Sequence, residues 1–448
     1  MESIIVAKFG GTSMADAVAM KRSAGVAKTH KANLVTVSAT SGTTNKLIKL
    51  TDLAVSSDWE SCEEIITNIK EKHLEIAKEL EISDLTYLND LLNEVETLSR
   101  GMFLLRDCSK KAFDAIQSLG ERMSSALFSR ALEITWADRK VKNFDVRKVM
   151  RTDDQFGKAT PLIEEIKSLC DTHLMDCKYD QLTYVTQGFI GQTECGQTTT
   201  LGRGGSDYSA ALLAEGIGAD ILQIWTDVAG IATTDPRIVP SAKLMNEITF
   251  SEAAELATFG AKILHPTTLT PALRKGISVY VGSSYEADAP GTWIKKSCED
   301  APLIRAMAIR KDQSLLTLST PKMLHTHGFL YEIFKIFNTH KVSVDSITTS
   351  EISVALTVDD STLLNKKLLH ELEALASLKV EEKLSLVSLI GNNINHTCGL
   401  ANQVFKALGD INVRMICLGA SKHNFCFLVD ETKASDAVAK LHEHFIGE

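Results

Sequence analysis

Hydrophobic residues in the first two thirds of the chain alternate between short β-rich runs and longer helical patterns. Five apolar runs are typical of strands buried on both faces, namely Ile4–Val6, Leu34–Val37, Leu182–Thr186, Ile221–Trp225 and Ile277–Val281. Such strands, separated by helical patterns, predict an α/β domain with a parallel sheet.

Between Cys62 and Gly120 the pattern changes to that of long amphipathic helices. One apolar stripe at three- and four-residue spacing consists of Leu88, Leu91, Leu92, Val95, Leu98 and Met102. A similar stripe just before it consists of Ile65, Ile66, Ile69, Leu74 and Ala77. We interpret these helices as an insertion or cap on the α/β core, with the stripes used for packing.

A polar segment with a Pro-Gly turn, Tyr285–Thr292, is typical of a domain edge. We therefore expect a first domain over residues 1–295 and a second region over residues 300–448, where shorter strand and helix patterns follow one another.

The second region contains an internal repeat that aligns without gaps at an offset of 71 residues (399 − 328). The matching pairs are Gly328 and Gly399, Phe334 and Phe405, Lys335 and Lys406, Val342 and Val413, Ser350 and Ser421, Val358 and Val429, and Asp359 and Asp430. Predicted strands precede each copy (Leu315–Leu318; Leu384–Ile390), and predicted helices follow (Leu368–Leu375; Ala437–Phe445). Each copy reads β-α-β-β-α and needs one more strand to complete a ferredoxin-like unit.

Composition and charge narrow the class of protein. A hydrophobic content of 44% with 23% charged residues is ordinary for a globular protein. A net charge of −9 and a pI near 5.8 argue against nucleic acid or an anionic membrane as the main partner. No C-x-x-C pair occurs among the nine cysteines, and no secretory signal or membrane-length apolar run is visible. We expect a cytoplasmic protein with free thiols.

A glycine pair follows the first predicted strand, in Lys8-Phe9-Gly10-Gly11-Thr12-Ser13. Two glycines at a strand-to-helix turn let a ligand approach the backbone, and exposed N–H groups there hold phosphate oxygens. Lys8 would add a positive charge for a transferring phosphoryl group. The stretch is not a Walker A loop, which requires G-x-x-x-x-G-K-[ST], and a purely structural turn remains the alternative.

Three later stretches carry further candidate chemistry. Thr198–Asp207 (TTTLGRGGSD) combines glycines with Arg203, a potential carboxylate clamp, and Asp207, which would orient a lysine or bind Mg²⁺. Trp225–Arg237 (WTDVAGIATTDPR) follows another core strand, and ligands of parallel α/β sheets bind at the carboxyl ends of strands. Thr258–Pro266 (TFGAKILHP) supplies Lys262, a second candidate phosphate lysine.

In combination, KFGGTS, TTTLGRGGSD, WTDVAGIATTDPR and TFGAKILHP resemble the amino-acid kinase family, and within it the aspartate kinases, over essentially the whole chain. The resemblance implies a parallel-sheet kinase domain followed by tandem ACT domains, with the first ACT unit (about 313–380) inserted in the second (about 300–312 plus 381–448). The missing strand of the repeat would then come from Ile304–Ile309. It also implies the use of ATP and Mg²⁺ to convert L-aspartate to 4-phospho-L-aspartate, the first step of lysine, threonine and methionine biosynthesis.

Residue roles follow from the same resemblance, one position at a time. Lys8 and Asp207 match the catalytic residues, and no side chain is assigned as a direct metal ligand. The aspartate site would consist of Ser38, Thr44, Glu121, Arg203 and Ser206. Glu121 would pair with the substrate ammonium group, and Arg203 and Ser206 would bind its α-carboxylate. The nucleotide side would consist of Lys8, Gly10, Gly11, Thr226, Asp227, Asp235, Arg237 and Lys262.

Ala232 departs from the family pattern on the nucleotide side, and Ser346 and His327 differ from the commoner Leu and Arg in the regulatory region. Ala232 stands where relatives often carry a tyrosine near the adenine, which weakens stacking on the nucleotide base or alters nucleotide preference. The neighbouring threonines and the Asp-Pro-Arg sequence match, so we expect activity to be retained.

The two copies of the repeat differ in charge in a way that bears on effector identity. The first copy has Asp345 and Glu351, and the second has Ile416 and Lys422 at the same offset. A cationic effector would be favoured by the first copy only, so we expect lysine there, with threonine or two solvated carboxylates as alternatives. The segment resembles lysine-sensitive aspartate kinases, in which the site lies between paired ACT domains of a homodimer. The candidate effector residues are Met323, Phe329, Leu330, Ser343, Val344, Asp345, Thr349, Ser350 and Glu351.

Two other functions compete with this interpretation. Another acyl-phosphate kinase of the same fold, such as a glutamate kinase, would use most of the same residues. A non-catalytic amino-acid sensor would keep the fold but has no need for Lys8, Asp207 and Lys262 together. We expect assembly into a homodimer, or a tetramer of paired dimers, through the ACT domains.

Overall fold

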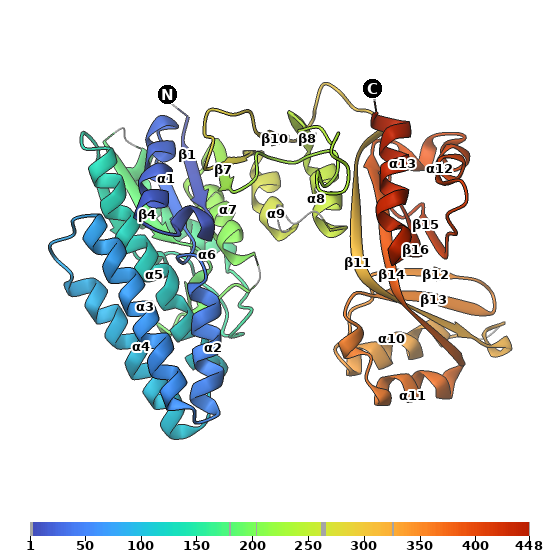
Figure 1. Ribbon diagram of the computed structural model, residues 1–448, viewed down its shortest axis with the longest axis horizontal. Helices are drawn as coiled ribbons and strands as arrows, with labels where there is room; N and C mark the ends of the chain where they lie inside the picture. Colours follow the sequence, from blue (N-terminus) through green and yellow to red (C-terminus); the bar gives the residue numbers. More distant parts are fainter. Residues whose placement is uncertain (1–2, 179–180, 203, 261–265, 325–326, 448) are drawn as a thin grey trace. The chain divides into compact units, whose positions relative to one another are not determined.

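The computed structural model describes residues 3–178, 181–202, 204–260, 266–324 and 327–447 (Figure 1). The chain divides into two compact units. The first consists of Met1–Ile231, Leu244–Phe250 and Ile263–Ser297, and the second of Ala232–Lys243, Ser251–Lys262 and Cys298–Glu448. The second unit thus takes in two short segments that the sequence placed within the kinase domain.

An eight-stranded sheet forms the centre of the first unit. Its strands are β1 (Ile5–Phe9), β2 (Leu34–Val37), β3 (Lys140–Phe144), β4 (Leu182–Gln187), β7 (Ile221–Thr226), β8 (Glu247–Thr249), β9 (Ser278–Ser283) and β10 (Thr292–Lys295). They lie in the order β3-β4-β2-β1-β7-β9-β10-β8. All neighbours are parallel except β9 and β10. The predicted parallel α/β sheet is confirmed, and the five predicted strands correspond to β1, β2, β4, β7 and β9.

Helices cover this sheet and extend beyond it. They are α1 (Ala17–Thr29), α2 (Thr43–Val55), α3 (Trp59–Glu79), α4 (Thr86–Leu105), α5 (Lys110–Thr135), α6 (Ile163–His173), α7 (Gly205–Ile217) and α9 (Pro266–Lys275). The long helix α5 packs on β2, β3 and β4 beside α1, and α7 packs on β1 and β7 beside α6 and α9. A small hairpin of β5 (Ile190–Gln192) and β6 (Thr198–Thr200) precedes α7.

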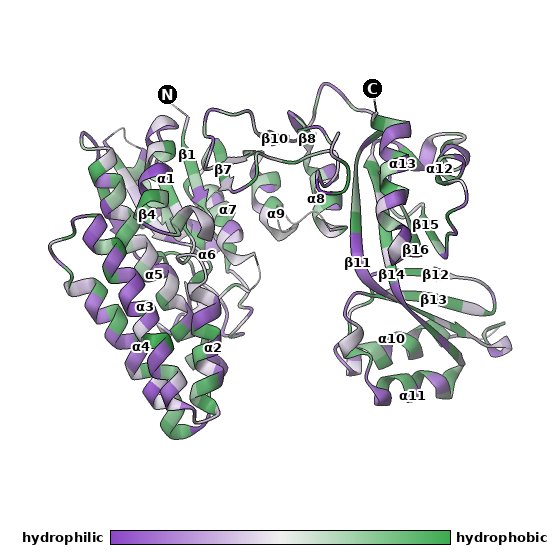
Figure 2. Ribbon diagram, in the orientation of Figure 1, coloured by the Kyte–Doolittle hydropathy of each residue, from purple (hydrophilic) through white to green (hydrophobic). Residues whose placement is uncertain are grey.

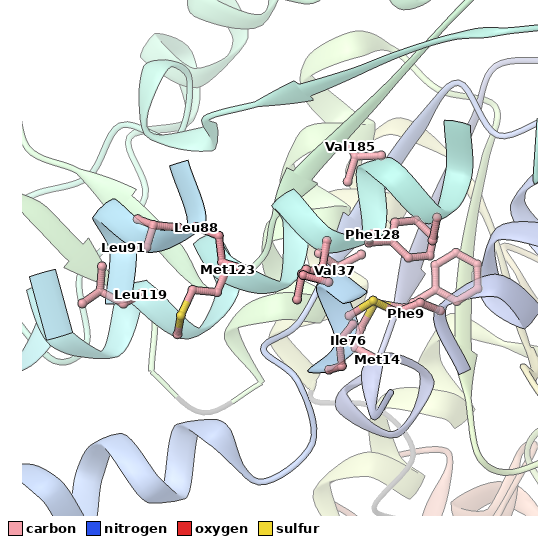
Figure 3. Packing of buried hydrophobic residues seen from close by; sticks show 14 of the residues in the cluster. Phe9, Met14, Val37, Ile76, Leu88, Leu91, Leu119, Met123, Phe128 and Val185 are labelled. Carbon is pink, nitrogen blue, oxygen red and sulfur yellow. The ribbon is translucent and has the colours of Figure 1, made fainter. Parts of the chain in front are cut away.

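The predicted cap is a bundle in which α2, α3 and α4 pack against one another and against α5. Hydrophobic and hydrophilic residues alternate around α3 and α4 (Figure 2). The stripe residues Leu88, Leu91, Leu92, Val95 and Met102 are buried, as are Ile65, Ile69 and Ala77. They join one apolar core with the end of the sheet, where Phe9 and Val37 lie near Phe128 of α5 (Figure 3). The central strands β1 and β2 therefore share one continuous apolar core with the helical bundle.

The second unit contains a six-stranded antiparallel sheet in the order β12-β13-β11-β14-β16-β15. Its strands are β11 (Ile304–Ser319), β12 (Ser346–Thr349), β13 (Ser353–Val358), β14 (Ser377–Gly391), β15 (Met415–Leu418) and β16 (Asn424–Asp430). Its helices are α10 (Phe329–Thr339), α11 (Lys366–Leu375), α12 (Leu400–Leu408) and α13 (Ala434–Ile446).

Two long strands are shared by both copies of the repeat. β11 and β14 pair along their whole length, from Ile304 opposite Gly391 to Ser319 opposite Ser377. The second half of β11 also pairs with β13 of the first copy, and the second half of β14 pairs with β16 of the second copy. The first half of β11 completes the second copy. The expected insertion of one ACT unit in the other predicts the same position for Ile304–Ile309.

The helix α8 (Phe250–Thr258) is held to the second copy by two carboxylates, the buried Glu252 and the half-buried Glu255. Glu252 forms an ion pair of 2.7 Å with Arg305 and also accepts a hydrogen bond from the Asn392 side chain. Glu255 accepts hydrogen bonds from Ser421 and Asn424. These contacts explain why the segment after Phe250 belongs to the second compact unit. Along the described parts of the chain, no helix combines the length and the apolar character needed to cross a bilayer.

The repeated glycines begin equivalent helices. Gly328 precedes α10 with φ of 83°, and Gly399 precedes α12 with φ of 79°. An added Cβ would meet nothing within 4 Å at either position. The glycines are therefore required by backbone conformation and not by close packing.

We predict that Gly328→Ala and Gly399→Ala will each lower the free energy of unfolding by about 1 kcal/mol, because alanine is strained at positive φ. Gly25→Ala is the matched control, since Gly25 lies inside α1 with open space around its Cα. Alanine there should raise stability by about 0.5–1 kcal/mol. Thermal unfolding of the three variants tests this, and equal shifts at Gly25 and Gly328 would contradict it.

Candidate functional site

A cavity of about 570 Å³ opens in the first unit where strands β1, β2 and β7 end and helices α2 and α7 begin. Its lining residues are Lys8, Gly10, Gly11, Thr12, Ser38, Ala39, Thr40, Ser41, Gly42, Thr44, Asn45, Glu121, Phe189, Gly202, Gly204, Gly205, Ser206, Asp207, Thr226 and Asp227. The carboxyl ends of parallel strands are the usual ligand site of such sheets.

One ion pair joins two of the sequence motifs across this cavity. Lys8 lies near the end of β1, and its Nζ is 2.5 Å from Oδ1 of Asp207 in the first turn of α7. Both side chains are largely shielded from water, with exposures of 10% and 16%. A shielded pair holds the lysine ammonium group in place, and the remaining N–H donors of that group stay available to a ligand phosphate.

Both helices that begin at the cavity start with a glycine of positive φ and no side-chain cap. Gly42 precedes α2 with φ of 77°, and Gly204 precedes α7 with φ of 73°. The first N–H groups of such a helix have no partner within the helix, and the helix dipole adds partial positive charge there. The two helix starts therefore offer donors to anionic groups in the cavity.

Close approach of backbones also shapes the cavity wall. A Cβ on Gly188 would lie 2.7 Å from Cβ and 2.8 Å from Cα of Ser206. A Cβ on Gly205 would lie 2.7 Å from the Phe189 ring. The absence of side chains at these glycines lets the start of α7 press against the turn after β4.

Glu121 is the buried carboxyl group of the site. It lies on α5 with 3% exposure, and its Oε1 accepts a hydrogen bond of 3.3 Å from the Ala39 backbone N–H. Its Oε2 has no hydrogen-bond partner among the described residues. Burial raises the pKa of Glu121 to about 8, because the surroundings offer little to stabilise a negative charge. An ammonium group in the cavity would supply the missing partner.

Asp114 is a positioning residue that the sequence did not reveal. It is fully buried on α5 and accepts hydrogen bonds from the Gly157 N–H, the Thr200 N–H and the Thr200 hydroxyl. These bonds tie β6 and the turn at Gly157 to α5. A lone aspartate within a helical pattern carries no sequence signal for this role, because its partners lie far away along the chain.

Most of the expected site residues meet in the cavity. Those that line it are Lys8, Gly10, Gly11, Ser38, Thr44, Glu121, Ser206, Asp207, Thr226 and Asp227. Asp235 and Arg237 belong to the second unit, where they form an ion pair of 2.7 Å with each other. Arg203 and Lys262 lie outside the described residues. The roles of all these residues remain predictions.

The expected effector residues lie in the first copy of the repeat. Asp345 immediately precedes β12, and Glu351 lies in the turn after it, so the two carboxylates stand at opposite ends of this strand. Asp345 forms an ion pair of 3.1 Å with Arg310, which also bonds Asp359. Burial raises the pKa of Asp345 although Arg310 opposes the shift, and Oδ2 of Asp345 has no hydrogen-bond partner among the described residues. Glu351 is exposed.

The family models agree with this arrangement. Residues 3–283 match the amino acid kinase family, and residues 387–445 match an ACT domain. The chain is 47% identical to lysine-sensitive aspartokinase 3 of Escherichia coli over 99% of both chains. The chain therefore belongs to the amino acid kinase family and, within it, to the aspartokinases.

Two solved structures are similar over nearly the whole chain. One is E. coli aspartokinase III in complex with aspartate and ADP, with 46% identity, a TM-score of 0.88 and coverage of 99% of this chain and 100% of that one. The other is the same enzyme in complex with lysine and aspartate, with 46% identity, a TM-score of 0.84 and coverage of 99% of each chain.

We predict that an ammonium-bearing ligand at Glu121 will release a proton when it binds at neutral pH. With its pKa at about 8, Glu121 is mostly protonated below that pH, and a bound cation favours the carboxylate. Affinity should rise by up to about tenfold per pH unit toward pH 8 and level off above it. Calorimetry in two buffers of different ionisation enthalpy measures the proton. Glu121→Gln should bind more weakly without proton release, and pH-independent binding by the unaltered protein would contradict the prediction.

Proposed function

We propose that this protein transfers the γ-phosphoryl group of ATP to the β-carboxylate of L-aspartate and forms 4-phospho-L-aspartate. The observation that carries the proposal is the single cavity in which the Lys8–Asp207 pair, the start of α7 and the buried Glu121 come together. Phosphate groups need a positively charged partner and an amino acid's ammonium group needs a negatively charged one. The cavity offers both, in Lys8 and Glu121. The similarity to an enzyme solved with aspartate and ADP supports this choice.

The chemistry assigned to each residue follows from its charge and position. The β-carboxylate of aspartate is ionised at neutral pH, so the acceptor needs no general base. Lys8 and the N–H groups at the start of α7 stabilise negative charge on the phosphoryl group as it transfers. Glu121 holds the substrate ammonium group, and the Ser38 and Thr44 hydroxyls line the same wall. Catalysis then depends on positioning and electrostatics.

Mg²⁺ fits this cavity as the partner of the nucleotide. Asp207 and Asp227 place carboxylate oxygens on its wall, and oxygen ligands are what Mg²⁺ prefers. Among the described residues, no group of three His, Cys, Asp or Glu side chains is arranged to hold a metal ion. Two carboxylates with phosphate oxygens and water suit an ion that arrives with ATP, where it would neutralise phosphate charge.

A catalytic role explains the site better than amino-acid sensing alone. A sensor needs Glu121 and the loop around Ser38, but it has no use for a shielded lysine at a phosphate-binding turn. A glutamate kinase of the same fold differs in substrate length and is distinguished by direct comparison of substrates. Cys62, Cys170 and Cys195 are examples of cysteines present as free thiols, in keeping with a cytoplasmic enzyme.

Lys8→Ala is expected to reduce aspartate-dependent turnover by about a hundredfold or more, because it removes the charge that faces the phosphoryl group. The measurement is ADP release from Mg-ATP with aspartate or glutamate. The matched control is Lys49→Ala, which removes an exposed lysine from α2 and should leave turnover unchanged. Normal turnover in folded Lys8→Ala would refute the role of Lys8, and a folded natural protein inactive with aspartate would refute the proposed function.

We further propose lysine as a feedback inhibitor that binds to the first copy of the ACT repeat. Glu351 offers an exposed carboxylate to a cation, and the buried Oδ2 of Asp345 has no hydrogen-bond partner among the described residues. Asp345 and Glu351 of one chain lie at opposite ends of β12. We infer that the lysine site is shared between two chains. Exposed apolar side chains in the repeat region also support a homodimer through it, and these are Leu330, Tyr331, Phe334, Ile347, Ile352, Ile416 and Leu418.

Glu351→Gln should raise the lysine concentration needed for half-inhibition by about tenfold or more, since a charge-assisted hydrogen bond contributes about 1.5–3 kcal/mol. Asp345→Asn should do the same, and turnover without lysine should stay within about twofold in both variants. Glu382→Gln, which neutralises an exposed carboxylate on β14, is the control and should leave inhibition unchanged. Turnover of the natural protein that is indifferent to lysine would remove the effector proposal and keep the enzyme.

A further inference from the structure

A buried chain of hydrogen bonds supports the loop between β2 and α2, which forms one wall of the cavity. The Thr43 and Thr40 hydroxyl oxygens lie 2.6 Å apart, and the Thr40 oxygen lies 3.2 Å from Nε2 of His73. Nδ1 of His73 lies 2.7 Å from the carbonyl oxygen of Ile69. Thr40, Thr43 and His73 are each at most 1% exposed.

The direction of every bond in this chain follows from its last member. The Ile69 carbonyl can only accept, so Nδ1 of His73 carries the proton and donates it there. In a neutral imidazole Nε2 must then accept, and its donor is the Thr40 hydroxyl. The Thr40 oxygen in turn accepts from Thr43. Burial lowers the pKa of His73 to about 4, which keeps the imidazole neutral and this order of donors unchanged at neutral pH.

The residue before His73 holds the same loop at the next position. Nζ of Lys72 donates a hydrogen bond of 2.6 Å to the backbone carbonyl of Ser41. Consecutive residues of α3 thus bind consecutive residues of the loop, Thr40 and Ser41. On the other side of Thr40, the Ala39 N–H donates to Glu121. The loop is therefore held between α3 and α5 by three separate contacts.

We propose that His73 is a positioning residue for the amino-acid substrate, acting through Thr40 to hold the loop after β2 and the first residues of α2 in their binding conformation. Ser38 of this loop and Thr44 of the first turn of α2 line the cavity, whereas His73 does not, so His73 acts without touching the substrate. The inference rests on the proposed function, because it assigns the loop to the aspartate side of the site. The nucleotide side is built from other segments, those around Gly10 and Thr226.

A histidine that only fills the core would have a different signature. Its replacement would change stability while the remaining folded enzyme kept its kinetic constants. A positioning residue changes the KM for aspartate, leaves the KM for ATP in place and responds to the chemistry of its substitute. The bond to Thr40 can be tested from both ends.

His73→Leu removes the acceptor for Thr40 and should raise the KM for aspartate about tenfold, with kcat and the KM for ATP within about threefold. His73→Gln keeps an acceptor near the position of Nε2 and should restore the KM to within about threefold. Thr40→Val removes the donor and should match His73→Leu, and the double variant should be no worse than either single one. Glu71→Gln, on the exposed face of α3, is the control and should behave as the natural protein.

Thermal unfolding of each variant confirms that assays are made on folded protein. If His73→Leu does not fold, His73→Gln and Thr40→Val still test the bond. An unchanged KM for aspartate in folded His73→Leu or Thr40→Val would overturn the inference. Effects that simply multiply in the double variant would also overturn it. A natural protein without aspartate-dependent turnover would overturn the proposed function first, and this inference with it.

Discussion

The shielded ion pair between Lys8 and Asp207 is the contact on which the site depends. It joins the end of a central strand to the first turn of α7, so the helix must approach the sheet closely at its start. Glycines at 188 and 205 permit that approach, since side chains there would collide with Ser206 and Phe189. The cost of desolvating the two charges is offset by their attraction only at short distance. The open helix start and the lysine consequently face the same cavity.

The sequence predicted those parts of the fold that local pattern determines. The five central strands were predicted correctly because they are apolar on both faces. The edge strand β3 (Lys140–Phe144) was not predicted, because most of its residues are polar and solvent-exposed. The repeat correctly placed the glycines that begin α10 and α12, because positive φ is a local requirement. Asp114 and His73 went unnoticed because their partners, Thr200 and Thr40, are distant in sequence. Only the fold brings such pairs together.

The regulatory region shows how a duplicated unit can lose its symmetry. Both copies share β11 and β14, so a displacement of either strand would change both copies. The first copy keeps Asp345 in a cluster with Arg310 and Asp359, whereas the second has Ile416 and Lys422 at the positions of Asp345 and Glu351. If the proposed effector binds at Asp345, it either displaces Arg310 or bonds Oδ2, which has no hydrogen-bond partner among the described residues. The first outcome would free Arg310 beside the irregular register of β11, where the halves of the two copies meet.

Two ionisable groups that contact the loop after β2, Glu121 and His73, are kept neutral by burial. Burial raises the pKa of Glu121 and lowers the pKa of His73, each by disfavouring the charged form. The loop after β2 is thus held by neutral hydrogen bonds to Glu121 and His73, together with the bond that the charged Lys72 donates to the Ser41 carbonyl. Under the proposed function, an ammonium group that binds in the cavity would ionise Glu121, and the carboxylate would gain a cationic partner. His73 meets no such charge, because the loop lies between it and the cavity, so the support remains constant while the binding group ionises. This division of roles allows the site to accept a charged ligand without reorganising the wall that positions it.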